Sequence, residues 1–98
     1  MEIRKSSIVR SVAGHDSGGL YFVLETDGVY ADIVNGKTRR IEKPKRKKLK
    51  HLRYESQGCG TAGEKLRCGE AVTNKEIRRG LAEYTAYPAE KMEVCKNG

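Results

Sequence analysis

The first half of the chain alternates short apolar runs with glycine-containing or charged turns, a pattern typical of an all-β fold. Residues 20–26 form the clearest predicted strand, because they combine aromatic and β-branched side chains. Shorter runs at 8–13, 29–34, 37–41 and 49–54 predict four more strands. Short strands this close together expose long sheet edges unless the sheet bends, so we expect a small barrel.

Two turn signals set the expected order of the central strands. Asp27-Gly28 and Asn35-Gly36 favour two-residue type I′ turns, because both dipeptides tolerate positive φ. They predict a three-stranded antiparallel meander, in which the expected opposite pairs are Leu24–Ala31, Phe22–Ile33, Asp32–Arg39 and Tyr30–Ile41. One apolar core face would follow, made of Leu20, Phe22, Leu24, Ala31 and Ile33.

The second half of the chain predicts a linker and one helix. Four glycines between residues 55 and 70 mark a flexible segment. Thr73 and Glu76 have the spacing of a capping box, and they predict a helix over residues 74–86. Gly80 disfavours this helix by roughly 1 kcal/mol relative to alanine. The expected apolar contacts are a staple between Val72 and Ile77 and a face made of Ile77, Leu81 and Tyr84.

Length and composition limit the class of protein. At 98 residues the chain is one small domain, with room for a compact core but not for a large substrate cleft. Residues 1–5 are charged and no apolar segment follows them, so we expect no signal peptide. The longest apolar run, residues 20–24, is far shorter than a membrane span. We therefore expect a cytoplasmic protein that does not enter a membrane.

The three cysteines do not form a recognisable site. Cys59, Cys68 and Cys95 are odd in number and lack the close C-x2–4-C spacing of zinc sites. No residue near them has the character of a catalytic base. We expect free thiols in a reducing compartment, with no metal and no cofactor.

Positive charge is concentrated in one stretch. Ten Lys and Arg residues lie within residues 37–53, where Glu42 is the one acidic residue, so this stretch carries +9 and the rest of the chain −2, for a net +7. Such a run can be a solvated face, but apolar residues interrupt this one, which argues for a folded basic band that binds a polyanion. Its cations are Lys37, Arg39, Arg40, Lys43, Lys45, Arg46, Lys47, Lys48, Lys50 and Arg53.

The turn between the first two predicted strands holds His15 and Asp16 among glycines. Catalysis would need a nucleophile and an orienting geometry that adjacent residues on one loop rarely provide. No Gly-Lys-Ser/Thr sequence follows, so the loop is not a Walker A phosphate cradle. Two interpretations stay open: a tight turn with positive φ at Gly14 and Gly18, or a turn whose backbone N–H groups and His15 contact a phosphate.

Histidine and tyrosine side chains could add contacts to the basic band. His51 either contacts phosphate or sugar, or is a structural histidine. Tyr21, Tyr30 and Tyr54 could stack on unpaired bases, although a tyrosine in a small barrel more often belongs to the core.

The sequence from residue 9 to 36, with Gly-His-Asp-Ser-Gly between two apolar strands, resembles the KOW motif of ribosomal proteins and of elongation factors of the NusG kind. The longer string SVAGHDSGGLYFVLETDGVYADIVNGKTRRIEKPKRKKLKHL is similar to the small bacterial KOW-domain RNA-binding proteins related to the fourteen-e type of large-subunit ribosomal protein. The segment TNKEIRRGLAEY is similar to the C-terminal helix of that group. The stronger similarity covers residues 6–54.

This resemblance implies a mainly β fold and a binding function without catalysis. It implies an SH3-like β-barrel over residues 6–54 and supports a C-terminal helix and tail over 71–98. The Gly-rich linker expected over 55–70 matches no part of the family and rests on its glycines alone. The implied ligand is ribosomal or other structured RNA, bound by a monomer through the turn at residues 14–18, the hairpin at 35–37 and the stretch 43–52.

One departure from the family concerns the first turn. The family often has an Arg before the Asp and a Lys after it, where this chain has His15 and Ser17, so the turn is less positive.

Two rival functions remain open. One is a KOW module that recruits an acidic protein, and the other is a small enzyme using His15 or a cysteine. In either case the C-terminal helix docks on the barrel through its apolar face or meets a partner protein.

Overall fold

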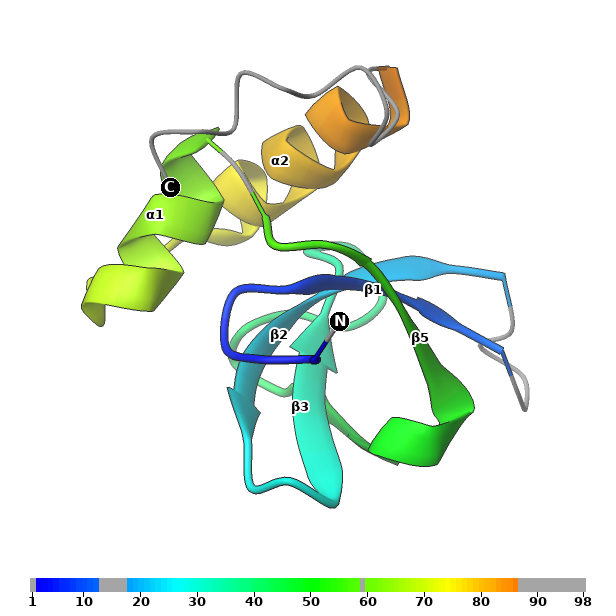
Figure 1. Ribbon diagram of the computed structural model, residues 1–98. Coiled ribbons are helices and arrows are strands. Elements are labelled where there is room, and N and C mark those ends of the chain that lie inside the picture. Colours follow the sequence, from blue (N-terminus) through cyan, green and yellow to red (C-terminus); the bar gives the residue numbers. More distant parts are fainter. Residues whose placement is uncertain (1, 13–17, 59, 87–98) are drawn as a thin grey trace.

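The computed structural model describes residues 2–12, 18–58 and 60–86, which form one sheet with helices on one side of it (Figure 1). The strands are β1 (Ile8–Ser11), β2 (Leu20–Thr26), β3 (Tyr30–Val34), β4 (Lys45–Lys48) and β5 (Leu52–Ser56). A 3-10 turn, η1 (Leu49–His51), precedes β5, and the helices are α1 (Gly60–Cys68) and α2 (Asn74–Ala86).

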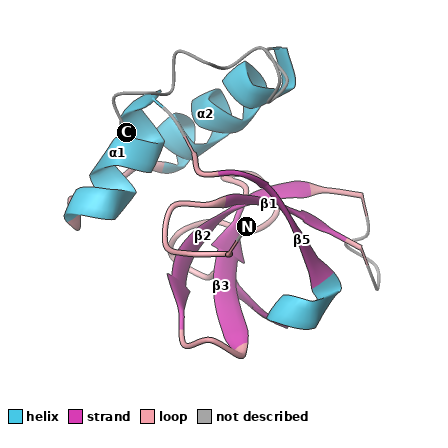
Figure 2. Ribbon diagram, viewed as in Figure 1, coloured by secondary structure: helices cyan, strands magenta, loops and turns pink. Residues whose placement is uncertain are grey.

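All five strands pair antiparallel, in the order β4-β3-β2-β1-β5. Within the described residues this sheet does not close, so the fold is a small β-rich domain with β4 and β5 as edges. Figure 2 shows α1 and α2 together on the same side of the strands. None of the helices in the described ranges is long and apolar enough to cross a membrane.

The core consists of two clusters, one on each face of the sheet. Because both faces are covered, the central strands have buried residues at successive positions, such as Tyr21, Phe22 and Val23 on β2. The helix-side cluster contains Ile8, Phe22, Val34, Ala62, Leu66, Val72, Ile77, Leu81 and Tyr84. The cluster on the opposite face is made of strand residues only and is called the sheet-side cluster. It contains Val9, Tyr21, Val23, Ala31, Ile33 and Leu52.

The predicted register of β2 and β3 is wrong, by two residues next to the turn and by one at Phe22. Phe22 lies opposite Val34 rather than Ile33, and a register shift occurs between Val23 and Glu25. Next to the turn, Asp27 Oδ1 accepts hydrogen bonds from the Val29 and Tyr30 N–H groups at 2.9 and 2.8 Å and lengthens the connection, so Glu25 lies opposite Asp32 rather than Tyr30. The irregularity between Val23 and Glu25 then takes back one residue and leaves Phe22 shifted by one. A shift of one residue exchanges faces, so Ala31 and Ile33 lie in the sheet-side cluster, away from Phe22.

The predicted strand at residues 37–41 is also wrong. The Asn35 side chain accepts hydrogen bonds from the N–H groups of Lys37, Thr38 and Arg39 at 2.9–3.0 Å, so Asn35 begins a loop rather than a two-residue hairpin turn. The chain returns to β3 only at β4, after Pro44. Asp32 therefore lies opposite Arg46, and Tyr30 lies opposite Lys48.

The described part of the expected flexible linker, 55–58 and 60–70, is largely strand and helix instead. It begins with the end of β5 and continues as α1, which contributes Ala62 and Leu66 to the helix-side cluster. Glycine serves close packing here, because a Cβ at Gly63 would collide with the backbone of Gly58. The sequence pattern could not distinguish glycines needed for contact from glycines that mark flexibility.

Helix α2 has the predicted bounds, and its capping box is confirmed. Thr73 Oγ1 accepts a hydrogen bond from the Glu76 N–H at 3.1 Å, and Glu76 Oε1 accepts one from the Thr73 N–H at 3.0 Å. Its apolar face packs on the sheet through Ile77, Leu81 and Tyr84, all in the helix-side cluster. The strand β2 also has its predicted bounds.

Candidate nucleic-acid interface

Strand β4 consists of four cationic residues, Lys45–Lys48, at one edge of the sheet. Its only partner strand among the described residues is β3, so the outer side of its backbone has no strand beside it. Successive side chains of a strand point to opposite faces, and four residues extend over roughly 10 Å. Charge along an edge also prevents pairing with a second chain, so this concentration of cations serves the fold as well as any ligand.

The two faces of β4 have different surroundings. Lys45 and Lys47 lie opposite Ile33 and Ala31, which are buried in the sheet-side cluster. Both lysines are partly buried, as is common for long cationic side chains whose aliphatic stems lie on apolar surface. Lys48 is exposed on the other face.

Arg46 is fixed by three neighbours on that other face. Its guanidinium donates to Asp27 Oδ2 at 2.8 Å and to Asp32 Oδ1 at 3.3 Å. It also lies over the Tyr30 ring, with 4.9 Å between Cζ and the ring centroid. Hydrogen bonds from the N–H groups of Tyr30 and Val29, together with the guanidinium, lower the pKa of Asp27, so this carboxyl is ionised at neutral pH.

The loop between β3 and β4 carries a second group of cations and is attached to α2. Asn74, the first residue of α2, accepts a hydrogen bond from the Ile41 N–H at 2.9 Å and donates to Glu42 at 2.9 Å. Arg78 donates to the Gly36 carbonyl at 2.6 Å. These contacts hold the loop on the helix, and its exposed cations are Lys37, Arg40 and Lys43, while Arg39 is partly buried.

A third group lies at η1 and β5, where Lys50 and Arg53 are exposed and His51 is partly buried. Arg53 and Arg10 both donate to Glu55 Oε2 at 3.1 Å. Tyr84 donates to the other oxygen of Glu55 at 2.8 Å, which ties α2 to the edge strand. Burial acts to raise the pKa of Glu55, but the hydrogen bonds from Tyr84, Arg53 and Arg10 outweigh it, and the pKa is lowered.

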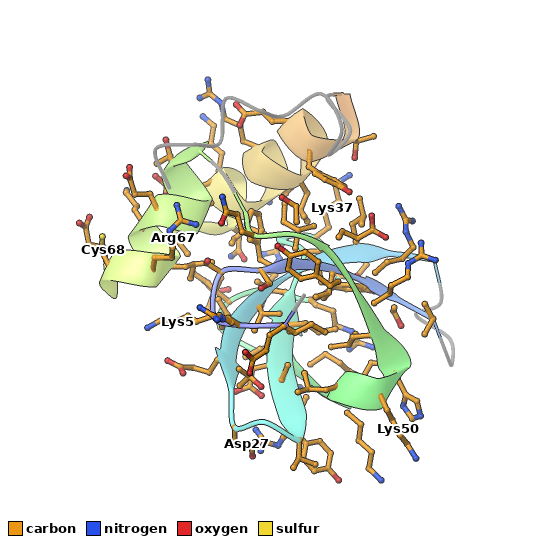
Figure 3. All side chains as sticks on the ribbon, viewed as in Figure 1. Lys5, Asp27, Lys37, Lys50, Arg67 and Cys68 are labelled. Carbon is orange, nitrogen blue, oxygen red and sulfur yellow. The ribbon has the colours of Figure 1, made fainter. Side chains whose placement is uncertain are left out.

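The band that is continuous in sequence is therefore distributed over the β3–β4 loop, β4, and η1 with β5. Figure 3 shows Lys37 near the helices and Lys50 at the opposite end of the sheet. Lys45–Lys48 lie between these groups in the sequence, along the edge strand. The His51 carbonyl accepts a hydrogen bond from the Val12 N–H at 2.9 Å, which joins η1 to the end of β1.

The first turn lies largely outside the described residues, so the expected contacts of Gly14 and His15 are not placed. Gly18 is described, and it has the positive φ expected of it, at 90°. Its carbonyl accepts a hydrogen bond from Arg10 Nη1 at 2.8 Å.

Three residues that belong to the site were missed by the sequence analysis. Arg10 reaches Glu55 and the first turn, Arg78 holds the basic loop, and Asp27 fixes Arg46. A lone arginine inside a predicted strand or helix gives no signal of such contacts. In the sequence Asp27 indicates only a turn, and its contact with Arg46 follows from the pairing of β4 with β3.

The tyrosines differ in role. Tyr21 is 4% exposed and belongs to the core, as expected. Tyr54 is partly buried, and Tyr30 is partly buried with cations over its ring.

The cysteines and acidic residues indicate no metal site. Cys68 is an exposed free thiol, and Cys59 and Cys95 lie outside the described ranges. Among the described residues, no group of three or more His, Cys, Asp or Glu side chains could hold a metal ion.

Comparison with known proteins gives no match for this chain, either among protein-family models or among curated protein sequences.

Proposed function

We propose that this protein binds RNA through its basic edge strand and the two neighbouring groups of cations, without catalysing a reaction. The observation that carries the proposal is β4, an exposed edge with four consecutive cations and no acidic side chain in the strand. Lysines on such an edge can each neutralise a phosphate, and counterion release then favours binding. Contacts of this kind position a nucleic acid without reading its sequence.

Ribosomal RNA is the ligand that the resemblance to KOW-domain proteins suggests, and the cytoplasm is the matching compartment.

We further propose that the sheet is related to an SH3-like barrel. Its support is a five-stranded antiparallel sheet with an apolar cluster on each face and a 3-10 turn before the last strand. Such a barrel would close by pairing of the two edge strands, β4 and β5.

Sedimentation of cell lysate through sucrose gradients at low and moderate salt tests this function. We expect the protein to migrate with large ribosomal subunits at low salt and to be released as salt rises, because the contacts are electrostatic. Migration only at the top of the gradient at low salt contradicts ribosome association. An interaction that survives RNase treatment would instead identify an acidic protein as the partner.

A further inference from the structure

Arg46 is held unusually firmly for a side chain that stays half exposed. Two carboxylates, Asp27 and Asp32, accept its hydrogen bonds, and the Tyr30 ring lies beneath it at 4.9 Å. The Arg46 side chain is nevertheless 54% exposed. The carboxylates take one N–H from each of two guanidinium nitrogens, and the ring lies against the group, while more than half of the side chain stays open to solvent.

The turn beneath this arginine is itself fixed. Asp27 Oδ1 accepts the N–H groups of Val29 and Tyr30, and Thr26 Oγ1 donates to the Tyr30 carbonyl at 2.9 Å. Val29, which precedes β3, is 59% exposed, so the turn also presents apolar surface to solvent. The arrangement is preorganised, and a ligand that binds there loses little conformational entropy in the protein.

We propose that Arg46 and Tyr30 form a stacking shelf for an unpaired RNA base. Bases stack on arginine planes as well as on aromatic rings, and only an unpaired base can present its face to a side chain on a protein surface. Lys48, with Nζ 6.0 Å from the Tyr30 centroid, lies where it can neutralise the adjoining phosphate. The inference rests on the proposed RNA-binding function and specifies single-stranded or looped RNA.

The shelf also explains why Arg46 differs from its neighbours on β4. A lysine at this position could bind phosphate equally well, but it lacks a plane on which a base can stack. The two aspartates would repel a phosphate that approached Arg46 directly, so the guanidinium is better suited to a base than to the backbone. Lys45, Lys47 and Lys48 remain the phosphate contacts of the strand.

The test compares Arg46→Lys with the wild-type protein on a single-stranded RNA and on a duplex of the same sequence. The substitution keeps the charge and removes the plane. We expect single-strand affinity to fall about 5- to 150-fold, the range for loss of one stacked base. Duplex affinity and the salt dependence of both complexes should stay unchanged. Tyr30→Leu should have the same selective effect, and Lys48→Gln should instead weaken both complexes and reduce the salt dependence.

A fluorescent base analogue, 2-aminopurine, gives a direct readout in wild-type protein, because stacking quenches its fluorescence. We expect quenching by the wild type and recovery of fluorescence with Arg46→Lys. An equal effect of Arg46→Lys on both RNAs, or none, would overturn the shelf and leave Arg46 as a structural ion pair. If Arg46→Lys does not fold, the wild-type protein still tests the shelf. Should it quench 2-aminopurine at no position of the single-stranded RNA, the shelf is overturned.

These outcomes are distinct from failure of the proposed function. A wild-type protein that binds neither RNA contradicts RNA binding itself. A wild-type protein that binds both with strong salt dependence, but whose single-strand preference is insensitive to Arg46→Lys, contradicts the shelf alone.

Discussion

The Phe22 ring packs directly against the backbone of Gly80, so that a Cβ at Gly80 would lie 2.9 Å from two ring atoms. Phe22 is completely buried at the centre of the sheet, and Gly80 is a buried position in the middle of α2. The glycine therefore sets how closely the helix approaches the sheet. Glycine disfavours the helix by roughly 1 kcal/mol relative to alanine, but it allows this close contact with Phe22.

Gly80→Ala should destabilise the protein by about 1–3 kcal/mol, because overpacking a buried contact outweighs the gain in helix propensity. Urea unfolding followed by circular dichroism measures this effect. Ala82→Gly, at an exposed position of the same helix, is the control and should cost about 1 kcal/mol through propensity alone. Stabilisation by Gly80→Ala would show that the helix can move away from Phe22 at no cost.

Glu55 should make stability depend on pH in the acid range. Its folded-state pKa is lowered, so its contribution is present above the unfolded pKa and is lost as pH falls through the folded pKa. Glu55→Gln should lower stability by about 1–2 kcal/mol at neutral pH, because hydrogen bonds from Arg10, Arg53 and Tyr84 lose their charged acceptor.

The measurement for Glu55 is the free energy of unfolding of both proteins between neutral pH and the acid limit of folding. We expect the difference between them to shrink as pH falls, since the wild type loses the contribution that the variant already lacks. Other carboxyls with lowered pKa, such as Glu42 and Glu76, affect both proteins alike. A difference that stays constant with pH would mean that the ionised state of Glu55 is irrelevant.

Asn74→Ala should loosen the basic loop while leaving α2 folded. The substitution removes the acceptor of the Ile41 N–H and the donor to Glu42. We expect faster amide hydrogen exchange at Ile41 and a stability loss of about 1 kcal/mol. Lys75→Ala, the exposed neighbour, is the control and should leave exchange at Ile41 unchanged. Unchanged exchange in Asn74→Ala would show that other contacts hold the loop.

Replacing Lys47 and Lys48 by Gln should reduce the salt dependence of RNA binding. Each phosphate contact on a single strand contributes roughly 0.7 to the slope of log affinity against log salt, so the slope should fall by about 1.4. The matched control is Lys75→Gln with Arg79→Gln, which removes the same charge from exposed positions on α2. Equal slopes for the two double variants would indicate that binding responds to net charge rather than to β4.

The elements that the sequence predicted well are those with local causes. The bounds of α2 follow from a capping box between residues three apart, and those of β2 from its own side chains. The prediction failed where a side chain bonds to the backbone beyond a turn, as Asn35 and Asp27 do. It also failed for α1, where Gly63 is explained by its close approach to the Gly58 backbone, five residues earlier, rather than by flexibility.

The candidate site divides in the same way. Sequence alone determined that a dense set of cations lies in residues 37–53, because charge is a property of composition. Only the tertiary structure decided how they are distributed, since pairing of β4 with β3 brings Arg46 beside Asp32 and onto Tyr30, fourteen and sixteen positions earlier in the chain. The register of a sheet depends on every turn before it, so contacts of this kind follow from the folded arrangement and not from spacing along the chain.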